Sequence, residues 1–68
     1  MASWQKVYQN NLEHKASIVK SILDDYDLNP VIVNKKDSSY QLGYYEVHVA
    51  PDNVIKALKI IEEEIDFK

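Results

Sequence analysis

The fold of this chain is decided by the stretch Tyr44-Tyr45-Glu46-Val47-His48-Val49-Ala50-Pro51-Asp52. From Tyr45 to Val49 every second residue is apolar, and the residues between them are polar, which is the period-2 pattern of a strand with one buried face. Pro51 then favours the first position of a helix. Apolar residues follow at helical spacing and need an apolar surface to lie on: Val54, Ala57, Leu58, Ile61 and Ile65. We therefore expect this strand and this helix to form the framework of a two-layer sandwich.

The length and the composition indicate one small folded domain over residues 1–68. A chain of 68 residues has room for one hydrophobic core. Its hydrophobic content of 46% argues against disorder. The chain has no Cys, so it can form no disulfide and has no thiolate metal ligand or cysteine nucleophile. This composition favours a reducing, cytoplasmic location.

The charges argue against nucleic acid and membrane partners. The net charge is −3, the pI is about 5.2, and all eight basic residues are Lys. Bidentate recognition of phosphate or guanine relies mostly on arginine, which is absent here. No polybasic cluster would hold the chain to an anionic membrane. No apolar run follows Met1, so we expect neither a signal peptide nor a membrane span.

A strand over Ser3–Gln9 and a helix over residues 11–26 are predicted for the first half of the chain. In the strand, Val7 is expected to face the core. Asn10 is a candidate N-cap, with Glu13 three residues later as in a capping box. Apolar residues then recur at spacings of three and four along the helix: Leu12, Ala16, Val19, Leu23 and Tyr26.

The sequence also predicts where this helix ends. Asp27 is expected in the left-handed conformation, which Asp tolerates better than most non-glycine residues. Leu28 would then contact Leu23, as in a Schellman motif. Pro30 prevents the helix from resuming.

The middle of the chain predicts a hairpin. Val31-Ile32-Val33 is a strand by propensity, and Asp37-Ser38-Ser39 supplies turn residues. Gly43 predicts a bulge or a sharp bend before the last strand. The hairpin register around Tyr40–Gly43 stays open. The order β-α-β-β-α indicates an α+β fold with a three-stranded antiparallel-type sheet and both helices on one face. This is a ferredoxin-like arrangement that lacks its last strand, with the Tyr44–Val49 strand in the centre.

These features resemble the "putative prokaryotic signal-transducing protein" family of small bacterial domains. The resemblance rests on the short strand around Val7, the first helix, the phrase Glu46-Val47-His48-Val49-Ala50-Pro51-Asp52-Asn53 and the helix containing Ala57-Leu58. In that family the first helix usually ends in Gly followed by Ile, where this chain has Asp27-Leu28. The resemblance implies a P-II-like, ferredoxin-like fold and a regulatory or binding role. It supplies no catalytic residues.

Catalytic and metal chemistry find little support in the sequence. Glu46 and His48 lie two apart on one strand face and could share a proton or a metal, but a transition-metal site needs three or four ligands. His14 is expected on the opposite side of the sheet. Ser38 and Ser39 have no base partner. We therefore expect no catalytic residue, no metal site, no cofactor and no enzymatic activity.

The outer face of the sheet is the strongest functional candidate. If Val7, Val47 and Val49 face the helices, a two-layer fold leaves aromatic and aliphatic residues on the other face, and such exposed groups often mark an interaction surface. We expect a non-enzymatic regulatory module that binds a protein or a small ligand there; the alternative is a homodimerising interaction domain. A tail or loop could also cover the face. The candidate binding residues are Trp4, Tyr8, Ile32, Tyr44 and His48.

Overall fold

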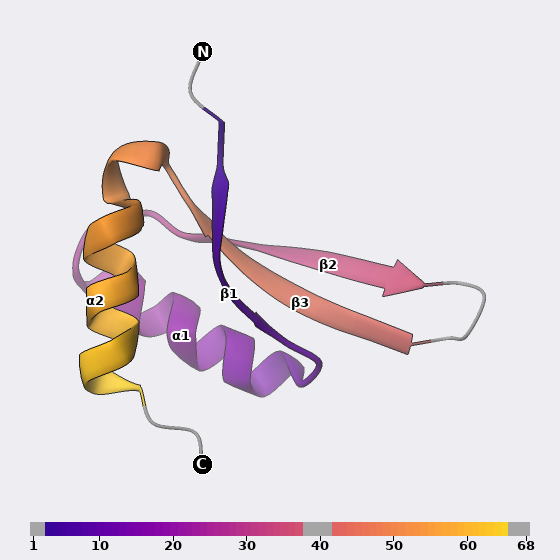
Figure 1. The fold of residues 1–68 in the computed structure, drawn as a ribbon. Helices are drawn as coiled ribbons and strands as arrows, with labels where there is room; N and C mark the ends of the chain where they lie inside the picture. Colours follow the sequence, from indigo (N-terminus) through magenta and orange to yellow (C-terminus); the bar gives the residue numbers. More distant parts are fainter. Residues whose placement is uncertain (1–2, 38–41, 66–68) are drawn as a thin grey trace.

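The computed structural model describes residues 3–37 and 42–65 and shows an α+β fold (Figure 1). The sheet has the strand order β1-β3-β2, and both neighbouring pairs are antiparallel. The predicted central position of the Tyr44–Val49 strand is thereby confirmed. The elements in chain order are β1 (Gln5–Asn10), α1 (Glu13–Asp25), β2 (Val31–Asp37), β3 (Leu42–Val49), the 3₁₀ helix η1 (Pro51–Asn53) and α2 (Val54–Glu64).

The core lies between one face of the sheet and the two helices. Val47 and Val49 of β3 are fully buried, as the alternation predicted. Both helices add buried side chains to the same cluster, and Tyr45 packs against it. The described arrangement is therefore the ferredoxin-like sandwich without a fourth strand. The buried apolar residues are Val7, Ala16, Val19, Leu23, Leu28, Val47, Val49, Ala57 and Ile60.

The end of α1 is a Schellman motif, as predicted. Asp27 has φ 63°, in the left-handed region. The Leu28 N–H donates to the carbonyl of Leu23 at 3.2 Å, and the Asp27 N–H donates to the carbonyl of Asp24 at 2.9 Å. Leu23 and Leu28 are both buried in the core. The hydrophobic contact of the motif is thus part of the core itself.

The predicted start of α1 was wrong by two residues. The helix begins at Glu13, and its N-cap position is Leu12, which has no side-chain cap. Asn10 is the last residue of β1, and its Oδ1 accepts a hydrogen bond from the Leu12 N–H at 2.9 Å. Asn10 therefore stabilises the turn before the helix, because an Asn side chain can form a hydrogen bond with the backbone two residues further along the chain.

The irregularity expected at Gly43 lies elsewhere. Gly43 is inside β3 and pairs with Lys36, and β2 and β3 keep an unbroken register from Val31↔His48 to Asp37↔Leu42. The bulge is in β1, between Lys6 and Tyr8. Residues 38–41, which include Ser38, Ser39 and Tyr40 of the predicted turn, are outside the described part of the chain.

Candidate functional site

The site is a group of polar side chains on the outer face of the sheet, away from the core. Directly opposite residues in antiparallel strands share a face. Lys6 lies opposite His48 and Gln9 opposite Glu46 across the β1–β3 pair. On the other side of β3, Val33 lies opposite Glu46. Glu46 is therefore at the centre of a three-strand row.

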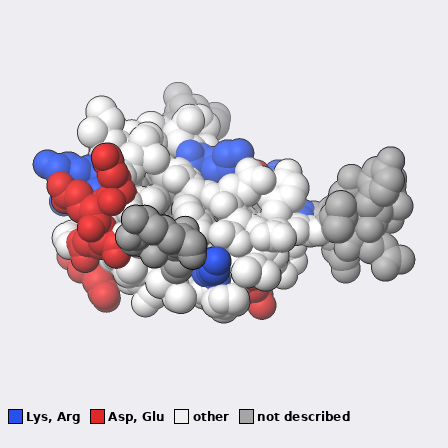
Figure 2. All heavy atoms as spheres, turned by 60° about the horizontal axis from the view of Figure 1, so that its bottom comes forward, with Lys and Arg blue, Asp and Glu red and all other residues white. Residues whose placement is uncertain are grey.

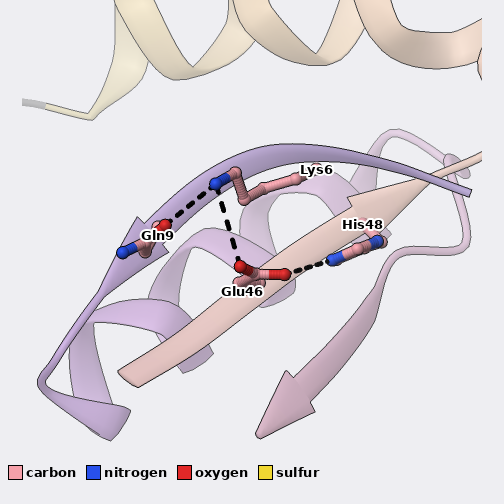
Figure 3. Close-up of polar contacts among 4 residues, drawn as sticks. All are labelled: Lys6, Gln9, Glu46 and His48. Carbon is pink, nitrogen blue, oxygen red and sulfur yellow. Dashed lines mark hydrogen bonds and ion pairs between the residues drawn. The ribbon is translucent and has the colours of Figure 1, made fainter. Parts of the chain in front are cut away.

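The polar groups around Glu46 contact one another (Figure 3). His48 Nε2 lies 2.8 Å from Glu46 Oε1, and Lys6 Nζ lies 3.8 Å from Glu46 Oε2. Lys6 Nζ also donates to Gln9 Oε1 at 2.9 Å. We call Lys6, Gln9, Glu46 and His48 the polar cluster. The Glu46 carboxylate has a different partner on each oxygen, so its negative charge is compensated within the cluster.

The cluster favours the ionised form of Glu46. The hydrogen bond from His48 is the main cause that lowers the pKa of the Glu46 carboxyl below its usual range. Burial raises this pKa, because only 7% of Glu46 is exposed. The positive charges of Lys6 and Lys35 lower the pKa further. An ionised carboxylate can only accept, so His48 donates through Nε2 in this arrangement.

The prediction that Tyr8 is on the outer face was wrong. Tyr8 pairs with Val47, a core residue of β3, and packs against the core. The reason is the β-bulge: on β1 two steps separate Lys6 and Tyr8, whereas one step on β3 separates their partners His48 and Val47. Val7 is the extra residue, so Val7 and Tyr8 both face the helices.

The prediction for Ile32 was also wrong. Ile32 pairs with Val47 and packs against the core, whereas Val31 pairs with His48 on the outer face. Three β-branched residues in a row carry no alternation, so only the pairing with β3 fixes which of them face inward.

The other three candidates lie on or beside the outer face but not at one point. His48 belongs to the polar cluster. Trp4, which is half exposed, borders a hollow of about 110 Å³ with Ser3, Ala50 and Pro51, where β1 begins and β3 ends. Tyr44 borders an open hollow of about 510 Å³ at the other end of the sheet, and its neighbours there are Gln9, Asn10, Asn11 and Gly43.

Sequence reasoning grouped Glu46 with His48 correctly but missed Gln9. In a regular strand Gln9 would share the face of Val7, and only the bulge brings it to the outer face beside Lys6. Lys35 was not among the candidate binding residues, and its register position opposite Tyr44 places it on the same outer face. In the sequence the bulge coincides only with the adjacency of Val7 and Tyr8, which by itself does not fix the side to which either residue points.

The described residues offer little for metal or nucleophilic chemistry. Residues 3–37 and 42–65 contain no group of three or more His, Cys, Asp or Glu side chains that could hold a metal ion. His48 contacts the carboxylate of Glu46. The other two members of the cluster, Lys6 and Gln9, carry neither a carboxylate nor a nucleophilic hydroxyl group. What the arrangement can do is hold a carboxylate ionised while presenting a lysine and an imidazole on an open surface.

Acidic side chains gather at a different part of the molecule. Figure 2 shows Asp and Glu atoms concentrated at one end of the surface in that view. Exposed acids occupy the ends of both helices: Asp24, Asp25, Glu62, Glu63 and Glu64. Tyr26, which follows α1, donates a hydrogen bond from its hydroxyl to Glu64 at the end of α2. These exposed acids lie on the helices, whereas Lys6 and Lys35 lie on the strands beside Glu46.

Comparison with known proteins gives one family match. The model of the family described as "Putative prokaryotic signal transducing protein" matches residues 4–65, nearly the whole chain. The chain belongs to this family. No curated protein and no solved structure matches. In the described residues, neither α1 nor α2 is long and apolar enough to cross a membrane.

The family membership accounts for the framework of the site. The match spans all three strands and both helices, so the strand that carries Glu46 and His48 belongs to the shared fold. The departure from the family pattern at Asp27-Leu28 leaves the helix end intact, since Asp27 adopts the left-handed conformation that the Schellman motif requires.

Proposed function

We propose that this domain is a non-enzymatic regulatory module that binds an anionic partner protein on the outer face of its sheet. The observation that supports it best is the polar cluster: both oxygens of the Glu46 carboxylate have partners within the cluster, and Lys35 on β2 adds an exposed positive charge beside it. Membership of a family described as signal transducing agrees with a regulatory role.

The charge distribution favours an anionic partner. Lys6 of β1 is about half exposed, and Lys35 is exposed on β2, on the other side of β3. Exposed acids lie at the ends of both helices, whereas Lys6 and Lys35 lie on strands of the sheet, in a chain whose net charge is −3. Complementary charge steers a partner toward such a face and fixes its orientation.

A protein partner fits the face better than a small molecule. Small-molecule sites are concave and mostly apolar, whereas protein interfaces combine apolar and polar groups over a broader area. The two hollows described above lie toward the ends of the sheet. The centre of the face combines the polar cluster with Val31 and Val33 of β2.

The experiment is a titration of ¹⁵N-labelled protein with an octamer of glutamate, with an octamer of lysine as the charge control. We expect saturable amide shifts around Lys6, Lys35 and His48 with the glutamate octamer only. Lys6→Gln and Lys35→Gln should each weaken binding, whereas Lys59→Gln, an exposed lysine on α2, should not. Equal shifts with both octamers, or no shifts on this face, would contradict the proposal.

Self-association is the second candidate. Strand β1 is at an edge of the sheet, and the fourth strand of a complete ferredoxin-like fold would pair with it. An unpaired edge is a template for a strand from another chain. Light scattering over a wide concentration range tests this: a monomer at every concentration rules out the homodimer.

A further inference from the structure

The two edges of the sheet differ in how open they are to another strand. Strand β1 is irregular because of its bulge, and α2 packs beside it. In Figure 3 the order across the picture is α2, β1, β3 and β2, so the outer edge of β2 faces away from α2. Strand β2 is seven residues long and keeps an unbroken register with β3. An added strand would therefore meet a regular edge at β2.

The backbone of β2 can accept such a strand. In an antiparallel edge strand, alternate residues direct their N–H and C=O groups away from the sheet. No Pro interrupts the sequence Val31–Asp37, so each residue keeps its N–H donor. Peptides that add to an open edge gain affinity from these backbone bonds and specificity from alternate side chains.

The outer-face side chains of β2 determine which alternate side chains the added peptide should carry. Val31, Val33 and Lys35 share this face, opposite His48, Glu46 and Tyr44, and Asp37 is the next alternate position, opposite Leu42. Val31 is 40% exposed, so apolar surface is available at the edge. Lys35 is exposed and supplies a positive charge four residues further along. An antiparallel segment with an acid opposite Lys35 and aliphatic residues opposite the two valines would match this row.

A second copy of β2 is the competing occupant of this edge, and its match to the row depends on the register. In an antiparallel β2–β2 pair centred on Asn34, Lys35 would lie opposite Val33 of the other copy and diagonal to its Lys35. A pair centred on Lys35 would place the two lysines directly opposite, which is unfavourable. Lysine on an edge strand is a common means of opposing self-pairing. A pair centred on Lys36 would instead place Lys35 opposite Asp37 of the other copy, so a β2–β2 dimer is an outcome of the test, seen as β2 amide protection that rises with protein concentration and needs no peptide. An acidic segment meets Lys35 without placing two lysines together.

We propose that β2 binds an extended acidic peptide segment of a partner protein as an added antiparallel strand, with a carboxylate at Lys35 and aliphatic side chains at Val31 and Val33. This inference rests on the proposed function, because it names the partner and its docking mode on the same face. It adds a direction and a register that the charge of the face alone does not give.

The probe is the peptide Ac-Thr-Glu-Thr-Val-Thr-Val-Thr-NH₂, whose alternate side chains match the row when it runs antiparallel to β2. The charge control replaces its Glu by Lys, and the backbone control replaces its central Val by Pro, which removes a donor. We expect saturable binding of the Glu peptide to the ¹⁵N-labelled full chain. New hydrogen-exchange protection should appear on alternate amides of β2.

A charge exchange tests the register. Lys35→Glu should weaken binding of the Glu peptide by roughly two- to fivefold, the effect of one exposed ion pair, and should strengthen binding of the Lys peptide by a similar factor. The gain with the Lys peptide shows that the variant is folded. Lys59→Glu, on α2, is the matched control and should shift both peptides equally and weakly.

The outcomes separate this inference from the proposed function. Protection on β1 amides, equal binding of the Pro peptide, or no binding of the Glu peptide would overturn strand addition at β2. The glutamate octamer would still report on the face as a whole. If the octamer shifts the residues of the polar cluster while the peptide fails, the proposed function stands and only the docking mode is wrong.

Discussion

His48 donates a hydrogen bond from Nε2 to Glu46 Oε1 over 2.8 Å, and this contact joins two residues of one strand on the face opposite the core. A strand places residues i and i+2 on the same face, so the pair needs no tertiary contact to come together. The tertiary structure adds Lys6 on the other carboxylate oxygen. The face thereby carries a nearly buried, ionised carboxylate in a sheet layer that no described helix covers.

Replacing Glu46 with Gln should change how stability depends on acid pH. The folded protein lowers the pKa of Glu46 below that of the unfolded chain. Its stabilising contribution is therefore complete above the unfolded pKa of about 4.3 and is lost as pH falls through the folded pKa. Urea unfolding from pH 7 to pH 2 should show a flatter acid dependence for Glu46→Gln. Glu62→Gln, at an exposed position on α2, serves as the control; an equal flattening there would contradict the prediction.

Replacing His48 with Ala should raise the pKa of Glu46 toward its usual range. The hydrogen bond from His48 is the main cause of the lowered pKa, so its loss leaves burial less opposed. The pKa can be followed by NMR of the ¹³C-labelled side-chain carboxyl. His14→Ala, on the exposed side of α1, should leave the titration of Glu46 unchanged. An unchanged titration in His48→Ala would show that the hydrogen bond does not form in solution.

Truncating Leu23 should be among the most destabilising substitutions. Leu23 is fully buried in the core and also contacts the Schellman motif through its carbonyl. Leu23→Ala should lower the free energy of unfolding by about 2–5 kcal/mol, because it leaves a cavity. Ile55→Ala is the matched control: Ile55 is 83% exposed, so its truncation should change stability by no more than about 0.5 kcal/mol. Urea or thermal unfolding measures both, and similar losses would contradict the described core.

Replacing Asp27 with Gly should stabilise the domain by about 1 kcal/mol, since glycine adopts the left-handed conformation without the clash of a Cβ. Asp27→Asn separates this backbone effect from the loss of a negative charge near the helix C-terminus. Chemical unfolding should show a larger gain for Gly than for Asn. If both substitutions give the same gain, charge and not conformation limits stability at this position.

Replacing Tyr26 with Phe should change the alkaline end of the stability profile. The hydrogen bond to Glu64 is the main cause that raises the pKa of the Tyr26 hydroxyl. This contribution is therefore present below the unfolded pKa of about 10 and is lost as pH rises through the folded pKa. Urea unfolding between pH 8 and pH 11 should show a flatter fall for Tyr26→Phe than for the parent chain. Tyr44→Phe, which keeps the bond between the helix ends, should retain the parent profile.

Local patterns in the sequence were enough to predict most of the fold. The alternation from Tyr45 to Val49 predicted the buried face of β3, and the Asp27-Leu28 pair predicted the end of α1. Both signals depend on residues within one element or one turn, whose geometry the backbone itself dictates. The same alternation brought Glu46 and His48 to one face. The prediction of the start of α1 failed because Asn10 bonds the turn instead of capping the helix.

Tertiary structure decided which residues form the site. The bulge at Val7 turned Tyr8 to the core and Gln9 to the outer face, and the register with β3 turned Ile32 inward and left Val31 outside. A one-residue change in pairing moves a side chain to the other face of a sheet, and nothing within a short strand records that choice. The sequence by itself determined the elements, their order and the Glu46–His48 pair. Strand pairing alone decided which lysines, valines and tyrosines share their face.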